Sequence, residues 1–211
     1  MVLTLYGYPL ATCTQRVVTV LHEKQVPFKF VTVDLAAGEQ KAPAYLEKQP
    51  FGQDDDGFIL YESRAIARYI AEKYATQGTT LIPKEAKAKA LFEQAASVET
   101  ANFDGFAGKA VMEKVFKPAF AGTKPDEALF ETQITELGKR LDVYDKILSK
   151  QKYLAGNEVT LADLFHLPYA ALLPQTGSKV IEERANVSRW IDDLKARASW
   201  QTVKEGIAST A

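Results

Sequence analysis

The fold is decided by residues 2–33, which read VLTLYGYPLATCTQRVVTVLHEKQVPFKFVTV. Residues 2–6 form a short run of strand-forming side chains that a glycine and a proline close. An apolar helical pattern follows and ends in a polar His-Glu-Lys sequence. Residues 28–33 then alternate with period two, as a strand does. Strand, helix and strand at this spacing predict a parallel pair of strands joined by a crossover helix.

The mixed pattern continues to about residue 80. Residues 38–48 are polar and lysine-rich and predict a short surface helix. Residues 58–61 predict another strand, because an Asp-Gly turn introduces a short apolar run. Residues 66–74 carry apolar side chains at helical spacing. The polar stretch 76–80 contains a glycine and predicts a linker.

Strand patterns vanish beyond about residue 82. Apolar residues recur at steps of three and four over 130–148, 187–194 and 200–207, so each stretch predicts an amphipathic helix. Thr160-Leu-Ala-Asp163 matches a capping box, in which the first and last side chains close the start of a helix. The second part of the chain is therefore predicted to be all-helical.

The composition narrows the class of protein. The 211 residues are 46% hydrophobic and 25% charged with a formal net charge of −1, which is typical of a globular protein and argues against a nucleic-acid partner. The single cysteine excludes an internal disulfide and a cysteine-rich zinc site. No apolar stretch reaches the roughly 20 residues that a membrane span needs, and residues 1–10 make a poor signal peptide. We therefore expect a cytoplasmic protein with no membrane partner.

The first candidate site is the turn after the first strand, residues 7–16. It brings small hydroxyl and thiol side chains to the start of a helix, where unpaired amides stabilise an anion such as a thiolate. Thr12 and Cys13 are therefore candidate catalytic residues. The alternative is that Thr12 only caps the helix and that Cys13 fills space in the core.

The second candidate site is YESRAI, residues 61–66. Ser63 is placed to cap the helix that follows, and the amides that need a cap can instead hold a ligand carboxylate. Glu62 can pair with a ligand ammonium group. The alternative is an ordinary helix cap beside a solvated charge.

These segments resemble the glutathione transferases, specifically the phi class. The resemblance covers nearly the whole chain, and its matching stretches are the strand–turn–helix around Pro9 and Arg16, GEQK at 38–41, PFGQ at 50–53, ESRAI at 62–66 and NEVTLAD at 157–163. It implies a thioredoxin-like α/β domain over residues 1–78, which binds glutathione, and an all-α helical domain over residues 84–211. It also implies a homodimer, in which Phe51 is an aromatic able to insert into the partner.

The resemblance assigns glutathione-binding residues by position. Glu62 and Ser63 would hold the γ-glutamyl end, Gln40 and Lys41 would contact the glycyl carboxylate, and Gln53 would lie beside the peptide backbone. The positive charge of Lys41 suits this role, because glutathione carries two carboxylates.

A hydrophobic co-substrate would lie between the two domains. The candidate residues are Leu10, Met112, Phe116 and Phe120. The last three are four residues apart and would share a helix face. The alternative for this stripe is plain core.

The chain departs from the family pattern at two places. The serine that donates a hydrogen bond to the glutathione sulfur would fall at Ala11, which has no donor. Thr12 stands one position along and can substitute for it, whereas Cys13 is out of register with the cysteine of family members that form mixed disulfides. After Gln53 a short segment with a cis-proline is missing from the pattern, which indicates either a remodelled site or omitted residues.

The leading hypothesis is a glutathione S-transferase that adds the glutathione thiolate to electrophilic apolar molecules, or reduces organic peroxides with the same thiolate. One alternative is a non-catalytic carrier of hydrophobic ligands on the same fold. Another is a glutathione-dependent thiol oxidoreductase that uses Cys13. His22 and His166 lie in unrelated segments without metal-site spacing, so no metal is expected.

Overall fold

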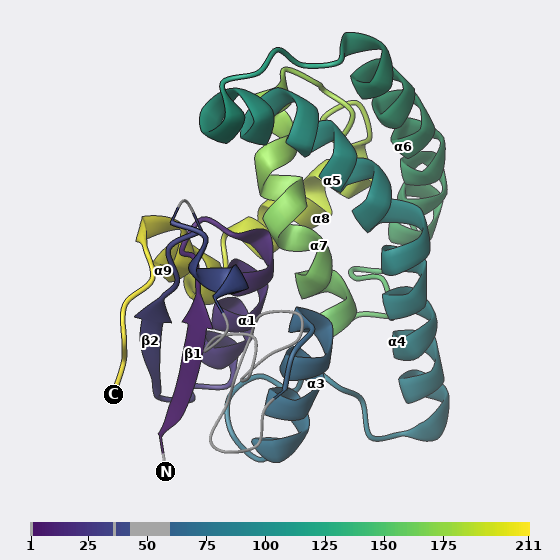
Figure 1. The fold of residues 1–211 in the computed structure, drawn as a ribbon. Coiled ribbons are helices and arrows are strands. Elements are labelled where there is room, and N and C mark those ends of the chain that lie inside the picture. Colours follow the sequence, from purple (N-terminus) through teal and green to yellow (C-terminus); the bar gives the residue numbers. More distant parts are fainter. Residues whose placement is uncertain (1, 36, 43–59) are drawn as a thin grey trace. The chain divides into compact units, whose positions relative to one another are not determined.

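The computed structural model describes residues 2–35, 37–42 and 60–211. The chain divides into two compact units, Met1–Leu81 with Arg197–Ala211, and Ile82–Ala196. Figure 1 shows the elements in chain order, and most of the described chain is helical. They are β1 (Leu3–Gly7), α1 (Thr12–Glu23), β2 (Phe28–Thr32), η1 (Glu39–Lys41), α3 (Ser63–Lys73), α4 (Ala86–Glu99), η2 (Thr100–Asp104), α5 (Gly105–Val111), η3 (Met112–Ala121), α6 (Glu127–Leu148), α7 (Leu161–Leu172), η4 (Leu173–Thr176), α8 (Ala185–Lys195) and α9 (Ala198–Glu205).

The first unit is built on the predicted strand, helix and strand. β1 and β2 pair in parallel, with Leu3 opposite Phe28, and α1 connects them. Leu3 and Leu5 are buried while their neighbours along β1 are half-buried, as the alternation of a strand requires. The first strand, the crossover helix and the second strand are therefore confirmed. α3 also packs against α1, which agrees with the helix predicted over residues 66–74.

The structure describes only parts of the two elements predicted between β2 and α3. The surface helix predicted over residues 38–48 is described only to residue 42, where it is the single 3₁₀ turn η1. Most of the strand predicted at residues 58–61 lies outside the described residues. Leu60 and Tyr61, which the structure does describe, are not in a strand.

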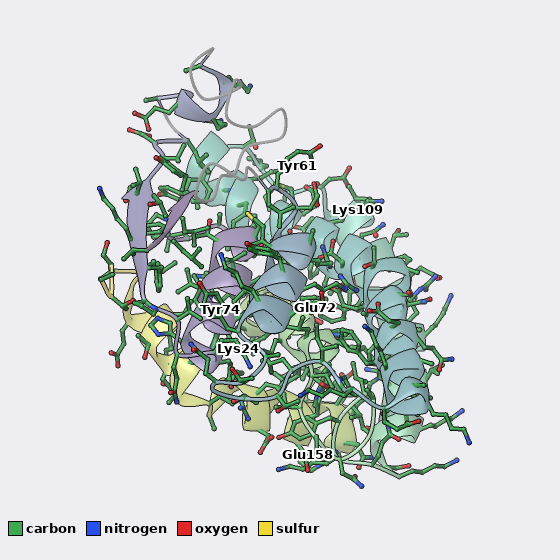
Figure 2. The ribbon with its side chains drawn as sticks, turned by 90° about the horizontal axis from the view of Figure 1, so that it is seen from below. Lys24, Tyr61, Glu72, Tyr74, Lys109 and Glu158 are labelled. Carbon is green, nitrogen blue, oxygen red and sulfur yellow. The ribbon has the colours of Figure 1, made fainter. Side chains whose placement is uncertain are left out.

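The predicted linker is tied to the end of α1. Lys24, which is labelled in Figure 2, follows α1. It donates from Nζ to the carbonyl of Thr79 at 2.8 Å, and Gln77 Nε2 donates to the carbonyl of Lys24 at 2.9 Å. Gly78 lies between these contacts with φ +59°, and a Cβ there would be 2.2 Å from the carbonyl oxygen of Glu23. This segment therefore caps the last carbonyls of α1 and is held by specific contacts, which its polar sequence alone did not indicate.

The second unit is helical, as predicted. Among its described residues the one β contact is an isolated bridge between Tyr153 and Gly156. Helix α7 forms the centre, since Leu161, Leu164 and Phe165 are fully buried. α4, η2, α5 and η3 follow one another with helical backbone angles at each junction, and η2 and η3 have π-helical hydrogen bonding. None of the described helices is long and apolar enough to cross a membrane.

The two units do not follow the predicted domain ranges at the end of the chain. Residues 197–211 pack with the first unit, where α9 contacts α1, although the prediction grouped them with residues 84–196. The division into residues 1–78 and 84–211 stays a prediction about functional domains.

Candidate functional site

No described side chain caps the start of α1. The N-cap residue is Ala11, which is extended with φ −72° and ψ 129° and has no acceptor in its side chain. The first turn also contains no acidic residue. The amides of this turn therefore keep the partial positive charge that makes a helix N-terminus attractive to an anion.

Thr12 and Cys13 differ in accessibility. Thr12 is 9% exposed, whereas Cys13 is half-buried. The neighbouring Thr14 is buried against the end of β1, and a Cβ at Gly7 would be 2.5 Å from Thr14 Oγ1. Gly7 therefore allows the close approach of strand and helix that fixes this turn. Of the two candidate catalytic residues, Cys13 is the one that a ligand reaches more easily.

The start of α3 has a strained backbone. Its N-cap residue is Glu62, with φ 71° and ψ 105°, and no described side chain caps this end either. Ser63 is the first residue of the helix, so the prediction that Ser63 is the N-cap is wrong by one position. A non-glycine residue with positive φ costs on the order of 1 kcal/mol and is concentrated at functional sites. The exposed side chain of Glu62 is thereby held beside the first turn of α3.

Arg16 joins the two helix starts. The residue is 3% exposed, and its Nη1 donates to Ser63 Oγ at 2.8 Å. Because Ser63 Oγ accepts this bond, its own hydrogen is available for donation to a ligand. A buried cation from the second turn of α1 and a serine hydroxyl at the N-terminus of α3 thus lie together, and this combination suits a carboxylate.

Gln40 and Lys41 lie in η1, which Gly38 introduces with φ 76°. Lys41 is exposed, and Gln40 Oε1 is buried without a hydrogen-bond partner among the described residues. A buried amide oxygen in that state is free to accept a hydrogen bond from a donor. The described contacts do not join η1 directly to Ser63, so the sequence-predicted residues form two separate groups.

Comparison with known proteins shows which protein family this chain resembles. Residues 1–72 match the glutathione S-transferase N-terminal domain, and residues 108–198 match the glutathione S-transferase C-terminal domain. Glutathione S-transferase PM239X14 of Arabidopsis thaliana is 47% identical over 194 residues, which are 88% of each chain. The chain belongs to the glutathione S-transferase family.

Solved glutathione S-transferases have the same fold. Glutathione transferase F7 of Populus trichocarpa has a TM-score of 0.92 at 41% identity, covering 97% of this chain and 98% of its own. Glutathione S-transferase I from maize, in complex with an atrazine glutathione conjugate, has a TM-score of 0.87 at 28% identity and covers 97% of both chains. The F relatives belong to the phi class, and so does this chain. The predicted fold, a thioredoxin-like domain followed by a helical one, is confirmed at the level of the family.

For a glutathione S-transferase, the segment between η1 and α3 would complete the site, but it lies outside the described residues. Gln53 falls there, as do Phe51 and the junction between Gln53 and Asp54 where the family pattern is short. These predictions are therefore not tested by the structure.

The predicted co-substrate residues of the second unit lie on η3. Met112 is 47% exposed and Phe120 is 62% exposed, so plain core is wrong for these two. The rings of Phe116 and Phe120 have centroids 6.0 Å apart, which shows that they share a face of the π-helix. Leu10, which is 57% exposed, belongs to the first unit.

Neither histidine is placed as a catalytic group. His166 is fully buried in the second unit, where Nδ1 lies 2.7 Å from the carbonyl oxygen of Ala162 and Nε2 lies 3.1 Å from Tyr144 Oη. It is a packed core histidine, as expected. His22 stacks edge-on against Phe28, and burial lowers its pKa.

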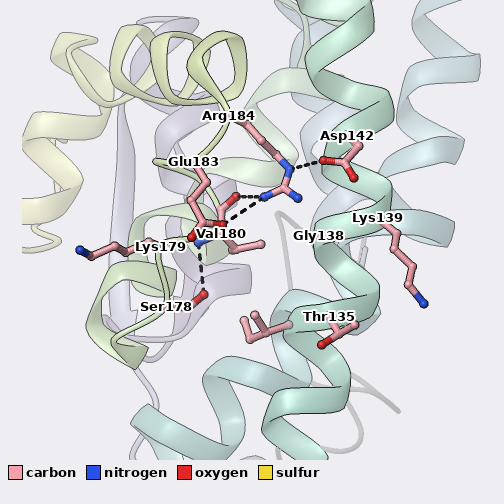
Figure 3. A pocket seen from close by; sticks show the side chains of 10 residues that line it. Thr135, Gly138, Lys139, Asp142, Ser178, Lys179, Val180, Glu183 and Arg184 are labelled. Carbon is pink, nitrogen blue, oxygen red and sulfur yellow. Dashed lines mark hydrogen bonds and ion pairs between the residues drawn. The ribbon is translucent and has the colours of Figure 1, made fainter.

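The second unit also contains a pocket of about 320 Å³ between α6 and residues 178–184 (Figure 3). Arg184 crosses it, donating from Nε to Asp142 Oδ1 at 2.8 Å and from Nη1 to the carbonyl of Val180 at 2.7 Å. Because the chain itself satisfies this guanidinium, the pocket is a weaker anion site than the start of α3.

Arg16 is a residue of the candidate site that the sequence analysis did not single out. It sits among Val17, Val18 and Val20 in a helix buried on nearly every side. A charged residue in such a helix requires a partner, and that requirement was the available signal. The sequence did not show that the partner is Ser63, 47 positions away.

Proposed function

We propose that this chain conjugates the glutathione thiolate to electrophilic apolar molecules. The observation that carries the proposal is the buried hydrogen bond between Arg16 and Ser63 at the starts of α1 and α3. This hydrogen bond brings donors for a carboxylate to the place where the family resemblance implies that the γ-glutamyl end binds. Membership of the glutathione S-transferase family supports the reaction class.

Each end of glutathione has a proposed partner. Ser63 donates its hydroxyl hydrogen to the γ-glutamyl carboxylate, with Arg16 behind it, and Glu62 pairs with the ammonium group. Lys41 and Gln40 bind the glycyl carboxylate, with Lys41 Nζ and Gln40 Nε2 as the donors. Gln53 is proposed to contact the peptide backbone, as the resemblance implies.

The thiol is activated at the start of α1. The partial charge of the helix N-terminus favours the thiolate over the thiol and lowers the thiol pKa. Ala11 supplies no hydroxyl, so the proposed donors are the first-turn amides and Thr12 Oγ1. On an aryl halide the thiolate attacks the ring carbon, a sulfur–carbon bond forms, and the halide departs with the bonding electrons. On an isothiocyanate the thiolate adds to the central carbon and the nitrogen takes up a proton, so nothing departs. Reduction of a hydroperoxide consumes two molecules of glutathione and yields the alcohol, water and glutathione disulfide.

Met112, Phe116 and Phe120 supply the apolar contacts to the co-substrate in this proposal, and Leu10 is a further predicted contact. The experiment is a calorimetric titration with glutathione together with turnover assays on an aryl halide, an isothiocyanate and a hydroperoxide. Millimolar or tighter binding with turnover above the uncatalysed rate is expected. A chain that neither binds glutathione nor turns over any of the three contradicts the proposal.

A second candidate function is a non-catalytic carrier of apolar ligands, which Ala11 as the N-cap of α1 favours. Under this alternative the chain binds apolar dyes while glutathione turnover stays near the uncatalysed rate. Efficient conjugation of any electrophile excludes it.

A third candidate is thiol–disulfide exchange through Cys13, favoured by its greater exposure beside the uncapped helix start. The Cys13 thiolate would attack a mixed disulfide with glutathione, releasing the partner thiolate and taking up the glutathionyl group. Cys13→Ser with undiminished exchange activity excludes this function.

We also propose that the chain acts as a cytoplasmic homodimer. A groove of about 240 Å³ between α4 and α6 supports an apolar contact with a second copy, since Leu91 is 52% exposed and Ile147 is 37% exposed at its rim. Light scattering is expected to give twice the chain mass. Leu91→Lys should yield monomers, whereas Leu129→Lys, an exposed leucine outside the groove, should not.

A further inference from the structure

The segment after α9 lies along the free edge of β2 (Figure 1). Gly206 turns the chain out of the helix with φ 129°, a value that side chains disfavour. Thr210 then binds Phe28 twice, because its amide donates to the Phe28 carbonyl at 2.9 Å and its Oγ1 accepts from the Phe28 amide at 3.0 Å. Ser209 Oγ accepts from the Phe30 amide at 2.8 Å.

These contacts substitute for a third strand. In a strand, the backbone groups of alternate residues point toward the same edge, so Phe28 and Phe30 share the edge opposite β1. The segment runs antiparallel to β2, since residue 209 meets residue 30 and residue 210 meets residue 28. Two side-chain hydroxyls take the place of strand carbonyls as acceptors.

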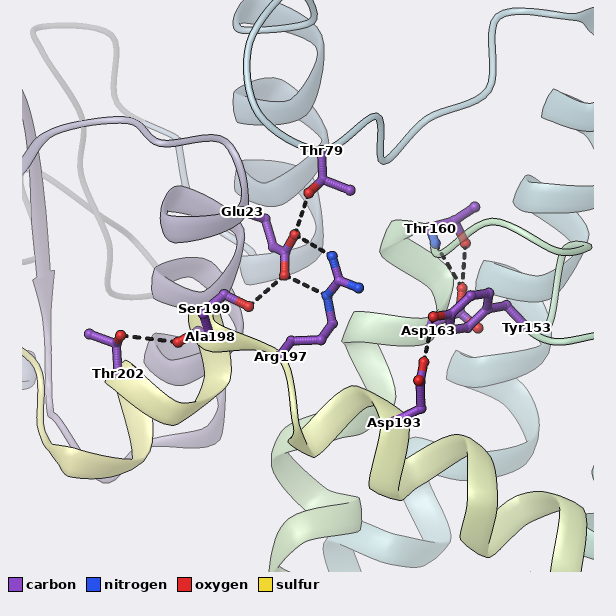
Figure 4. Close-up of polar contacts among 10 residues, drawn as sticks. All are labelled: Glu23, Thr79, Tyr153, Thr160, Asp163, Asp193, Arg197, Ala198, Ser199 and Thr202. Carbon is purple, nitrogen blue, oxygen red and sulfur yellow. Dashed lines mark hydrogen bonds and ion pairs between the residues drawn. The ribbon is translucent and has the colours of Figure 1, made fainter.

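Helix α9, which precedes this segment in the chain, is fixed to α1. Glu23 on α1 accepts from Arg197 Nε at 2.6 Å and from Arg197 Nη2 at 2.7 Å, and also from the hydroxyls of Ser199 and Thr79 (Figure 4). The Glu23 side chain is 5% exposed, so this ion pair is largely shielded from water. Residues 206–211 therefore start from a fixed helix end.

β2 leads directly into the loop that carries Gln40 and Lys41. The amide of Val33 donates to the carbonyl of Gly7 at 2.9 Å, which ties the end of β2 to the start of the turn toward Cys13. Beyond it, the loop closes on itself: the amide of Asp34 donates to Glu39 Oε2 at 2.7 Å, and the amide of Glu39 donates to the carbonyl of Asp34 at 3.0 Å. A self-closed loop of this kind moves with the strand that holds it.

We propose that Ser209 and Thr210 are positioning residues for the glycyl end of glutathione. By completing the edge of β2 they hold the strand in place, and the strand sets the position of Gln40 and Lys41. The proposal rests on the proposed function, because it assumes that these two residues contact the glycyl carboxylate.

The test compares two ligands that differ only in glycine. Glutathione has the glycyl carboxylate and γ-glutamylcysteine lacks it, so a loss confined to glutathione locates the effect at Gln40 and Lys41. The variant is Ser209→Ala with Thr210→Val in the full chain. Ser209→Thr with Thr210→Ser keeps both hydroxyls and serves as the rescue. Thr202→Val is the matched control, because Thr202 Oγ1 donates to the carbonyl of Ala198 on an exposed face of α9 and does not touch β2.

Hydrogen exchange and calorimetry give the expected results. The amides of Phe28 and Phe30 should exchange faster in the double variant, and its glutathione affinity should fall about three- to tenfold, the equivalent of one net hydrogen bond. The affinity for γ-glutamylcysteine should not change. The rescue and the Thr202→Val control should behave as the wild type.

Other results overturn the proposal. Unchanged exchange at both amides shows that the segment does not protect β2. An equal loss for both ligands shows general loosening of the unit, and no loss shows that η1 is positioned without this segment. A wild-type chain that does not bind glutathione overturns the proposed function as well, whereas intact wild-type binding with an unaffected variant overturns the positioning role alone.

Discussion

The starts of α1 and α3 contrast with the start of α7. Both halves of the predicted capping box are present at α7, and Asp163 Oδ2 accepts from the amide of Thr160 at 2.8 Å and from its hydroxyl at 2.9 Å (Figure 4). Asp163 Oδ1 also accepts from the amide of Leu154 at 2.9 Å and from Trp190 Nε1 at 3.0 Å. α1 and α3 begin with Ala11 and Glu62, and no described side chain caps them.

This difference separates stability from binding. A helix start that its own chain satisfies stabilises the fold and has little left for a ligand, whereas an uncapped start keeps its electrostatic attraction for an anion. The same division holds at α4 and α6 of the second unit, which Glu85 and Asp126 cap with their side chains. The uncapped starts of α1 and α3 lie in the first unit, beside Arg16 and Ser63.

Asp163→Ala tests the stability side and should have the largest effect. The substitution leaves four donor groups without their acceptor, three of them in buried hydrogen bonds, so the free energy of unfolding should fall by about 3–5 kcal/mol. Urea unfolding measures the change, and Asp192→Ala, which removes an exposed carboxylate on α8, should change it by less than about 0.5 kcal/mol. The folded fraction of Asp163→Ala should still bind glutathione with wild-type affinity. Weaker glutathione binding by that folded fraction would contradict the separation of stability from binding.

Ser63→Ala tests the binding side. Loss of the hydroxyl removes the donor proposed for the γ-glutamyl carboxylate, so calorimetry should show glutathione affinity reduced about 10- to 100-fold. Ser63→Thr keeps a hydroxyl and should retain most of the affinity. Ser97→Ala, at an exposed position of α4, is the control for loss of a serine. Full affinity in Ser63→Ala would show that the start of α3 does not hold the ligand.

Glu23→Gln tests the ion pair between the end of α1 and the start of α9. Burial by itself raises the pKa of Glu23, but the hydrogen bonds from Arg197, Ser199 and Thr79 outweigh it and hold the pKa below its ordinary value of 4.5. The ion pair therefore stabilises the fold above about pH 4.5, and this contribution is lost as the pH falls through the folded-state pKa. The variant should lose about 2 kcal/mol at pH 7 and less at pH 3. Equal losses at both pH values, measured by urea unfolding, would contradict this assignment.

Ala11→Ser tests how far the uncapped start of α1 substitutes for the hydroxyl that the phi-class pattern expects. A serine here adds a donor to the thiolate, so kcat/KM for an aryl halide should rise about tenfold and the thiol pKa of bound glutathione should fall. Thr12→Ala is the companion variant. If Thr12 already supplies the donor, Ala11→Ser should have little effect and Thr12→Ala should lower the rate about tenfold. If neither variant changes the rate, the backbone amides are the groups that activate the thiol.

Much of the fold was predictable because its signals are local. The alternation over residues 28–33, the three-and-four spacing over residues 130–148 and the capping box at Thr160 each depend on neighbouring residues. The elements β2, α6 and α7 follow from them. The candidate site was partly predictable for the same reason, since Ser63 and Cys13 occupy recognisable positions at helix starts.

The long-range partners were not predictable from one sequence. Nothing local indicates that Arg16 binds Ser63, that Glu23 binds Arg197 174 positions away, or that Ser209 and Thr210 lie along β2. The polar stretch at residues 76–80 has the composition of a free linker, yet the amide of Thr79 donates to the last carbonyl of α1 and the carbonyl of Thr79 accepts from Lys24 Nζ.

The sequence by itself determined the order of strands and helices, the buried faces and the family, because these depend on local periodicity and on short motifs along the chain. The tertiary structure decided which buried charge meets which partner and which helix starts stay open to a ligand. A buried ionic or polar group must be satisfied wherever the fold places a partner, and for Arg16 and Glu23 that partner lies far away in the sequence.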